Sequence, residues 1–353
     1  MGGTVFAALV AALALGRAET APPVTLARER AADYSPIYPF TELPANQHDF
    51  VALARFDNPP KKVRFTLIAV DTNGADPPNQ PVFSQEGEHG GAKVGMFRFD
   101  THQEWKLGRY AVEVFADGAL LGRAEFVVVA AVPPLAISDP GALLAAEPGT
   151  AWHFETALAA NPNPGFRYSI KGVEPDAGGM LRMRGTRSVV AREGDLIHMH
   201  VARDDTPQGT SEEFWRLDAS GYAFVRKVEG GKTGEFAPPQ LWIPLPPTPQ
   251  SWTWHAAAGP GEGQFRLWGP LPIAGPHGTE PGLLVREFQT DGQIELTTEL
   301  DFIPRLGVVR EIDIEAVVKD GRTAMYMATT ISPAGGAKPA NPATEGFSSG
   351  KAK

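Results

Sequence analysis

The sequence predicts an all-β protein with two domains, a β-sandwich followed by a larger curved antiparallel sheet or open barrel. Three observations predict this. Apolar and polar residues alternate with period two over long stretches of the second half, most clearly in 293–302 and 308–319. Short apolar runs recur at intervals of roughly 8–12 residues, with turn residues between them. Gly (38) and Pro (33) are abundant and follow no period, which favours many turns over long helices.

The amino-terminal segment is typical of a signal peptide. Residues 4–15 (TVFAALVAALAL) form an apolar run that is too short to span a bilayer. Gly16 and Ala18 supply small residues for cleavage, so we expect residues 1–18 to be removed and the protein to be exported, either periplasmic or secreted. A retained membrane anchor is the alternative. No later stretch approaches the ~20 apolar residues of a spanning helix, so no membrane span is expected after cleavage.

Composition excludes several classes of function. The chain has no cysteine, which excludes disulfides, thiol catalysis and thiolate metal sites. Its formal charge is −9, and no basic patch opposes this charge. Because a net acidic surface repels phosphate backbones, nucleic acid is not an expected partner.

The first domain is expected over residues 24–132. Residues 19–41 are interpreted as a linker or a first edge strand. The expected strands follow at 50–56, 62–70, 95–99, 109–115 and 120–129. Asp117-Gly118 between the last two favours a tight hairpin turn, since both residue types tolerate positive φ.

The segment WKLGRYAVEVFADGALLGRAEFVV, residues 105–128, resembles the final hairpin of bacterial immunoglobulin-like modules. In those modules a Gly-x-Tyr entry precedes the penultimate strand, and an Asp-Gly or Asn-Gly turn leads into the last one. The resemblance implies an immunoglobulin-like sandwich with an adhesive or spacer role. It carries no catalytic residues across.

A Pro/Ala-rich linker is expected at 133–147, followed by a large antiparallel β domain over 148–332 and a disordered tail over 333–353. Expected strands of the second domain are 152–156, 166–171, 181–191, 195–203, 212–218, 222–228, 241–243, 251–255, 263–268, 283–288, 293–302, 308–319 and 323–331. The run PRLGVVRE from Pro304, after a strand ending in Phe302, resembles a sequence motif in exported bacterial curved-sheet proteins related in shape to lipoprotein carriers. That resemblance implies a concave sheet that shelters an apolar ligand.

The last three strands yield a register prediction. Matching the apolar parities of 293–302 and 308–319 places Glu299 opposite Glu311 and Thr297 opposite Asp313. The apolar positions Ile312 and Ile314 are then expected on one buried face, and the acidic positions on a solvated face. Asp320-Gly321 is expected to form the following hairpin turn. A calcium-type site on the acidic face is the less favoured alternative.

Four tryptophans are the candidate ligand-binding residues. Trp242, Trp252, Trp254 and Trp268 lie close together in the sequence, and Trp252 and Trp254 share one strand face. They are interpreted first as core residues of a curved sheet. The alternative is a platform that stacks on sugar rings or lines an apolar cavity.

His198 and His200 are the candidate metal ligands, because two imidazoles at i and i+2 on one strand face can chelate a metal with a third ligand. Two half-exposed polar residues are the commoner outcome, so no metal and no cofactor are expected. The chain contains none of the short catalytic motifs of lipases, zinc proteases or nucleotide-binding enzymes. No catalytic residues are therefore predicted.

These observations favour a non-catalytic exported envelope protein that acts as a structural or interaction module, with an envelope protein or glycan as its partner. The first alternative is a carrier or sensor that binds an apolar or sugar ligand in the concavity of the second domain. The second alternative is a hydrolase acting on polysaccharide, whose two carboxylates would come from distant strands.

Overall fold

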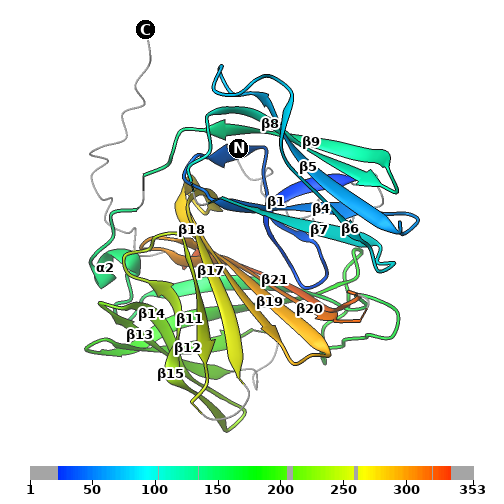
Figure 1. Ribbon diagram of the computed structural model, residues 1–353. Coiled ribbons are helices and arrows are strands. Elements are labelled where there is room, and N and C mark those ends of the chain that lie inside the picture. The colour runs from blue at the N-terminus through cyan, green and yellow to red at the C-terminus, as the bar shows by residue number, and fades with distance from the viewer. Residues whose placement is uncertain are drawn as a thin grey trace, which may run out of the picture.

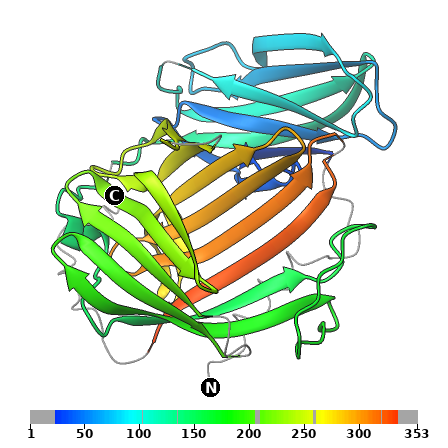
Figure 2. The ribbon, with the colours of Figure 1, turned by 90° about the horizontal axis from the view of Figure 1, so that it is seen from below.

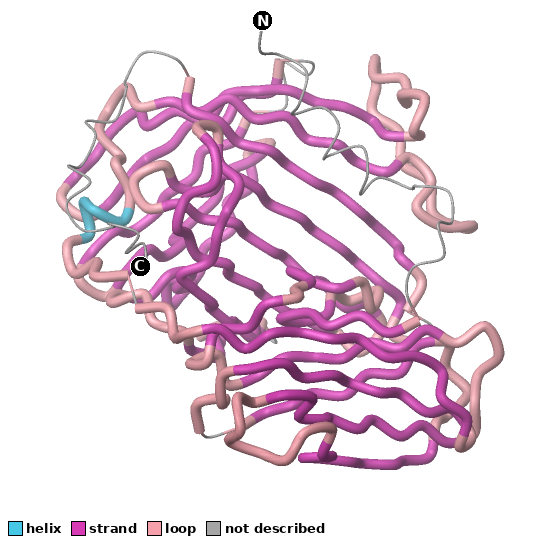
Figure 3. Tube along the Cα trace, turned by 90° about the horizontal axis from the view of Figure 1, so that it is seen from above, coloured by secondary structure: helices cyan, strands magenta, loops and turns pink. Residues whose placement is uncertain are grey.

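The computed structural model describes residues 23–334, apart from 102, 134, 205–209, 258–260 and 320. The described residues form three β-sheets and one short helix, which confirms the all-β prediction (Figures 1 and 3). The predicted signal peptide, the predicted tail beyond residue 334 and Asp320 of the predicted turn lie outside the described residues. No helix in the described part of the chain has the length and apolar character needed to cross a membrane.

The first domain is a sandwich of two sheets with strand orders β2-β1-β4-β7 and β3-β9-β8-β5-β6. Its strands are β1 (Val24–Arg30), β2 (Pro36–Pro39), β3 (Glu42–Pro44), β4 (Asp49–Arg55), β5 (Lys62–Asp71), β6 (Gln80–Glu88), β7 (Val94–Asp100), β8 (Gly108–Ala116) and β9 (Ala119–Val129). Aromatic rings fill the space between the sheets, with Phe50 stacked on Phe99 at 5.0 Å and in edge contact with Phe126 at 5.2 Å. This core anchors both sheets.

The β8–β9 hairpin has the predicted turn. Asp117 and Gly118 both adopt positive φ (48° and 85°), as a tight hairpin turn requires. The Asp117 carboxylate also accepts hydrogen bonds from the backbone N–H groups of Lys61 and Lys62, which ties the turn to the start of β5.

The second domain is one twelve-stranded antiparallel sheet that curves into a nearly closed barrel (Figure 2). The strand order is β15-β14-β13-β12-β11-β10-β21-β20-β19-β18-β17-β16. The strands are β10 (Ala151–Ala159), β11 (Met180–Glu193), β12 (Leu196–Arg203), β13 (Ser211–Asp218), β14 (Gly221–Glu229), β15 (Lys232–Pro244), β16 (Gln250–His255), β17 (Glu262–Gly275), β18 (Gly278–Thr290), β19 (Ile294–Ile303), β20 (Gly307–Val317) and β21 (Thr323–Pro333). The strand expected at 166–171 is absent, and Ile170 makes only an isolated bridge to Val173.

The segment expected as a linker contributes to the barrel. It contains the helical turn α2 (Pro140–Leu143), capped by the Asp139 carboxylate, which accepts from the Gly141 N–H at 3.0 Å (Figure 1). Leu143 and Leu144 are buried among barrel residues, and the Arg305 N–H donates to the Leu143 carbonyl at 2.8 Å. This segment therefore covers one end of the barrel interior.

The register predicted for β19 and β20 is wrong by one residue. Leu300 lies opposite Glu311 and Thr298 opposite Asp313, whereas Glu299 faces Ile312. The acidic positions of β20 thus point to the inside of the barrel, and its apolar positions point outward.

The outward apolar face of β20 is buried because the sandwich packs against it. Ile312 and Ile314 lie in a cluster that joins both domains, with Ile37 and Tyr38 on the sandwich side. The buried members from the barrel are Trp268, Leu271, Ile273, Leu284, Ile303, Leu306, Val309, Ile314 and Ala316. The expectation that this sheet has one buried and one solvated face is therefore wrong, since the first domain covers part of the outside.

Candidate functional site

The inner face of the barrel has an apolar end and a polar middle. The apolar end lies against the α2 segment and comprises Trp152, Val189, Ile197, Met199, Trp215, Leu217, Tyr222, Trp242, Ile243, Leu267, Leu283, Leu300, Phe302 and Ile331. Further along each strand, the alternate residues that point inward are charged or carry amide side chains. The polar residues of this middle layer form the candidate site.

Four carboxyl groups, the Arg187 guanidinium group and the Lys227 ammonium group define the middle layer. Cross-strand register places Glu287, Thr298 and Asp313 side by side on β18, β19 and β20. Glu311 lies two residues from Asp313 on the same face, and Glu213 on β13 approaches Arg187 at 3.4 Å. The layer therefore carries an excess of acidic groups.

Burial controls how these carboxyls titrate. It raises the pKa of Glu287 to about 7, and the nearby Asp313 carboxylate adds to this shift. Burial and Asp313 also raise the pKa of Glu311, with Arg187 acting in the opposite direction. The pKa of Asp313 rises for the same reason, although Thr298 donates to its Oδ1 at 2.6 Å. Near neutral pH the layer can therefore both donate and accept hydrogen bonds.

Glu287 is held from both sides by amide groups. Its Oε1 accepts from Gln240 Nε2 at 2.6 Å and from Gln289 Nε2 at 2.5 Å. The Gln240 side chain is oriented in turn by the Trp242 indole N–H, which donates to its Oε1 at 3.2 Å. No described residue donates a hydrogen bond to Oε2 of Glu287. Oε2 of Glu287 is therefore an open acceptor in the layer, and no described residue donates a hydrogen bond to Glu311 either.

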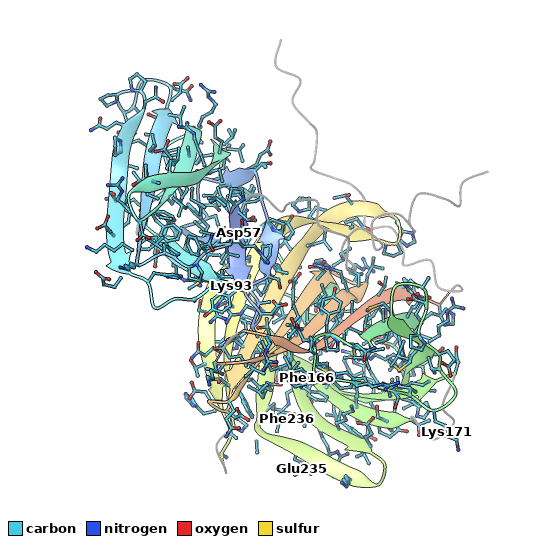
Figure 4. All side chains as sticks on the ribbon, turned by 90° about the vertical axis from the view of Figure 1, so that its right-hand side faces the viewer. Asp57, Lys93, Phe166, Lys171, Glu235 and Phe236 are labelled. Carbon is cyan, nitrogen blue, oxygen red and sulfur yellow. The ribbon has the colours of Figure 1, made fainter. Side chains whose placement is uncertain are left out.

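Aromatic rings flank this carboxyl. Trp252 stacks on Phe265 with ring centroids 5.4 Å apart, and Phe265 pairs with Glu287 in the β17–β18 ladder. Trp254 contacts Phe236 of β15, which is labelled in Figure 4, at 5.8 Å. Carboxyl and amide groups beside aromatic faces are typical of surfaces that bind hydroxyl-rich ligands.

Trp252 and Trp254 also close the barrel. They lie on β16, and their indole N–H groups donate to the carbonyls of Leu241 (3.1 Å) and Pro238 (2.8 Å) on β15. β15 contains three prolines and so lacks the N–H groups of a full ladder. The indole groups replace part of the missing backbone pairing across this seam.

The other sequence-predicted site residues lie elsewhere. Trp242 joins the inner core, but Trp268 is buried on the outer face against the sandwich and does not meet the other three. His198 Nε2 and His200 Nδ1 each lie 2.6 Å from a Glu212 oxygen on the outer face. Within the part of the chain that the structure describes, no group of three or more His, Asp or Glu side chains is arranged to hold a metal ion.

Sequence reasoning missed the inward carboxyls. Glu311 and Asp313 were expected in solvent because the apolar parity of β20 was taken as the core side. Of the two amide partners of Glu287, Gln289 is on the same strand but Gln240 is distant in the sequence, so the sequence alone did not indicate a carboxyl held from both sides. Comparison with known proteins finds no family model that matches this chain and no curated protein with significant similarity to it.

Proposed function

We propose that this protein is a non-catalytic, exported envelope protein that binds a hydroxyl-rich ligand, such as a glycan, on the inner face of its barrel. The observation that carries the proposal is the Glu287 carboxyl, whose Oε1 is fixed by two amides while Oε2 has no partner among the described residues. A carboxyl group near its pKa can accept from or donate to a sugar hydroxyl. The half-buried Trp252 ring, which stacks with one face on the buried Phe265, supplies an aromatic surface on which a sugar can stack.

The acidic layer favours this ligand over a lipid. Burying an acyl chain against Glu287, Glu311 and Asp313 would remove water from these carboxyls without replacing its hydrogen bonds, which costs about 1–3 kcal/mol for each unsatisfied group. An anionic ligand would be repelled as well. Among the ligands expected for the concavity, a neutral or amino sugar therefore fits better than an apolar molecule. Export is supported by the apolar segment 4–15.

Calorimetric titration with neutral and amino oligosaccharides tests the proposal, preceded by mass spectrometry of glycans that copurify with the protein. We expect Glu287→Ala to weaken binding by about tenfold, the loss of one or two hydrogen bonds. Glu262→Gln serves as the control, because Glu262 is exposed on β17 and does not face the interior. Equal affinities in the two variants would exclude the inner face as the binding surface.

A polysaccharide hydrolase is the second candidate. Glu287 has a pKa of about 7 and interacts with Asp313, and a pair of carboxyls with shifted pKa values is what glycoside hydrolysis requires. Against this, Asp313 is engaged by Thr298 and Glu287 by two amides, so both groups are tied into the barrel wall. Release of reducing ends from oligosaccharides, lost in Glu287→Gln, would favour the enzyme over the binding protein.

A further inference from the structure

A groove of about 450 Å³ lies on the outside of the barrel, where the sandwich meets β16, β17 and β18. Its walls combine β1 and β7 of the first domain with these three strands of the second. Four arginines line it, two from each domain, namely Arg30, Arg98, Arg266 and Arg286. Glu29 is the only acidic residue in the lining. The groove is thus opposite in charge to the inner face of the barrel.

Buried carboxylates pair with these arginines but do not balance them. Glu29, whose side chain is 2% exposed, accepts a hydrogen bond from Arg98 and forms an ion pair with Arg286 Nη1 at 2.8 Å. Asp49 accepts from Arg98 Nη1 at 2.8 Å and from Arg266. Three guanidinium groups therefore share two carboxylates.

Two further arginines, Arg30 and Arg28, lie close to these ion pairs. Arg30 pairs with Glu295 at 2.9 Å, which neutralises it. Arg28, which does not line the groove, is only 1% exposed and lies over the Phe40 ring, and its Nε and Nη1 atoms have no hydrogen-bond partner among the described residues. Four guanidinium groups of the groove thus meet three carboxylates, an excess of one positive charge. Because uncompensated buried charge is costly, a network that only held the domains together would be expected to balance.

Arg286 is the groove arginine whose positive charge is least balanced by neighbouring carboxylates and hydrogen bonds. Its side chain is 11% exposed, and its buried Nε has no hydrogen-bond partner in the part of the chain that the structure describes. Burial, opposed by Glu29 and assisted by the charges of Arg30, Arg98 and Arg266, lowers its pKa to about 10. An anion in the groove would relieve this repulsion.

The guanidinium groups are held in place before any ligand arrives. Arg286 and Arg30 both lie over the ring of Phe288, at 4.9 Å and 5.4 Å from its centroid, and Arg266 lies over Trp268 at 5.4 Å. Planar guanidinium groups in fixed orientations suit two-point binding of carboxylate and phosphate oxygens. Ser251 and Thr253 add hydroxyl groups at the rim.

We propose that this interdomain groove binds an oxyanion group, a carboxylate or a phosphate ester, carried by a small organic molecule of about the size of a monosaccharide. Arg266 and Arg286 contact the anion from the barrel, and Arg98 contacts it from the sandwich. Because both domains supply ligands, bound anion also strengthens the contact between them.

Calorimetry on the purified chain tests this with four probes: inorganic phosphate, glucose 6-phosphate, glucuronate and neutral glucose. We expect saturable binding of at least one anion, weakened by added salt, and no binding of glucose in the groove. Preference for the phosphates over glucuronate, or the reverse, identifies the oxyanion, and either result supports the proposal. Failure of all three anions to bind at up to about 10 mM would overturn it.

Two pairs of variants locate the site. Thr253→Glu adds a carboxylate at the exposed rim without touching the arginine network and is expected to weaken anion binding by at least about tenfold, whereas the neutral Thr253→Gln should not. Arg286→Gln should weaken binding similarly, with Arg123→Gln on the surface of β9 as the charge-matched control. If Arg286→Gln does not fold, the Thr253 pair decides. Anion binding that is unchanged in Thr253→Glu would place the site elsewhere and refute the proposal.

Discussion

Leu300 and Glu311 face each other across β19 and β20, with both side chains on the inner face of the barrel. An apolar and an acidic residue thus share one surface, and the apolar residues of β20 are turned toward the sandwich. With this register, both faces of β20 are in contact with other parts of the protein. The inner face contributes to the acidic layer, and the outer face holds the two domains together.

We predict that Ile314→Ala weakens the contact between the domains. Ile314 is 6% exposed and lies in the cluster formed with the sandwich. Truncating a buried isoleucine leaves a cavity and typically costs about 2–4 kcal/mol of unfolding free energy. Urea unfolding measures this. Val318→Ala, at an apolar position that is 43% exposed, should change stability by less than about 0.5 kcal/mol. Equal effects would mean that β20 faces solvent on this side.

How far the sequence predicts this fold depends on whether a signal is local. The Asp117-Gly118 turn was predictable because the turn requires positive φ at both positions, and Asp and Gly tolerate this conformation whatever their surroundings. The α2 turn had a readable signal in Asp139 followed by Pro140, a capping residue and a favoured first helical residue, although the segment was interpreted as a linker. β6 was missed because it is an exposed edge strand with little apolar alternation, formed by pairing with β5.

The candidate sites depend on non-local contacts, which the sequence pattern does not specify. The alternation in β20 identifies a strand. It does not show whether the apolar or the acidic residues point into the barrel, because the sandwich also buries the outer face. The groove joins Arg30 and Arg98 to Arg266 and Arg286, residues of two domains with no shared motif. Only the packing of the domains brings these charges together.

We predict that Trp252→Phe loosens the seam of the barrel. Phenylalanine preserves the stacking on Phe265 but removes the indole N–H that donates to the Leu241 carbonyl. Loss of one such hydrogen bond costs about 0.5–1.5 kcal/mol, and the effect should concentrate where β15 and β16 meet. Hydrogen exchange of the β15 and β16 amides measures it. Thr253→Ala, on the opposite face of the same strand, should leave exchange unchanged, and a similar rise in both variants would contradict the role of the indole.

We predict that Glu29→Gln destabilises the protein strongly. Glu29 forms ion pairs with Arg98 and Arg286 in a buried position, and its loss leaves these guanidinium groups without their shared counter-charge. Breaking a buried ion pair from one side typically costs about 3–5 kcal/mol. Glu125→Gln, an exposed partner of Arg123, is the control and should have little effect.

The same carboxylate contributes to acid sensitivity. Although burial alone would raise it, the charges of Arg286 and Arg98 hold the pKa of Glu29 below its ordinary value. The stabilisation from Glu29 is therefore present above about pH 4.5 and is lost as the pH falls through its lower folded-state pKa. Urea melts at a series of acidic pH values should show this loss in the native protein and not in Glu29→Gln.

We predict the opposite pH dependence for Glu287. Its folded-state pKa is about 7 against an ordinary value of 4.5, so between these values the folded protein binds more protons than the unfolded chain. The unfolding free energy must then decrease as the pH rises through this window, by up to roughly 3 kcal/mol from this group. Glu287→Gln removes the titration and keeps a hydrogen-bonding group of the same size. The variant should therefore become more stable than the native protein as the pH approaches about 8.

The effect of Glu287 is measured as the difference in unfolding free energy between the native protein and Glu287→Gln at each pH. This is necessary because Asp313 and Glu311 also have raised pKa values and lower the unfolding free energy as the pH rises. Chemical unfolding at about pH 5 and about pH 8 suffices. The two proteins should differ more at the higher pH, where the buried carboxylate is ionised in the native protein alone. A difference that is the same at both pH values would mean that Glu287 titrates normally and lies in a well-hydrated environment. The inner wall of the barrel would then be accessible to water at this point, and the amide-held carboxyl could not act as the selective hydrogen-bonding group on which ligand recognition depends.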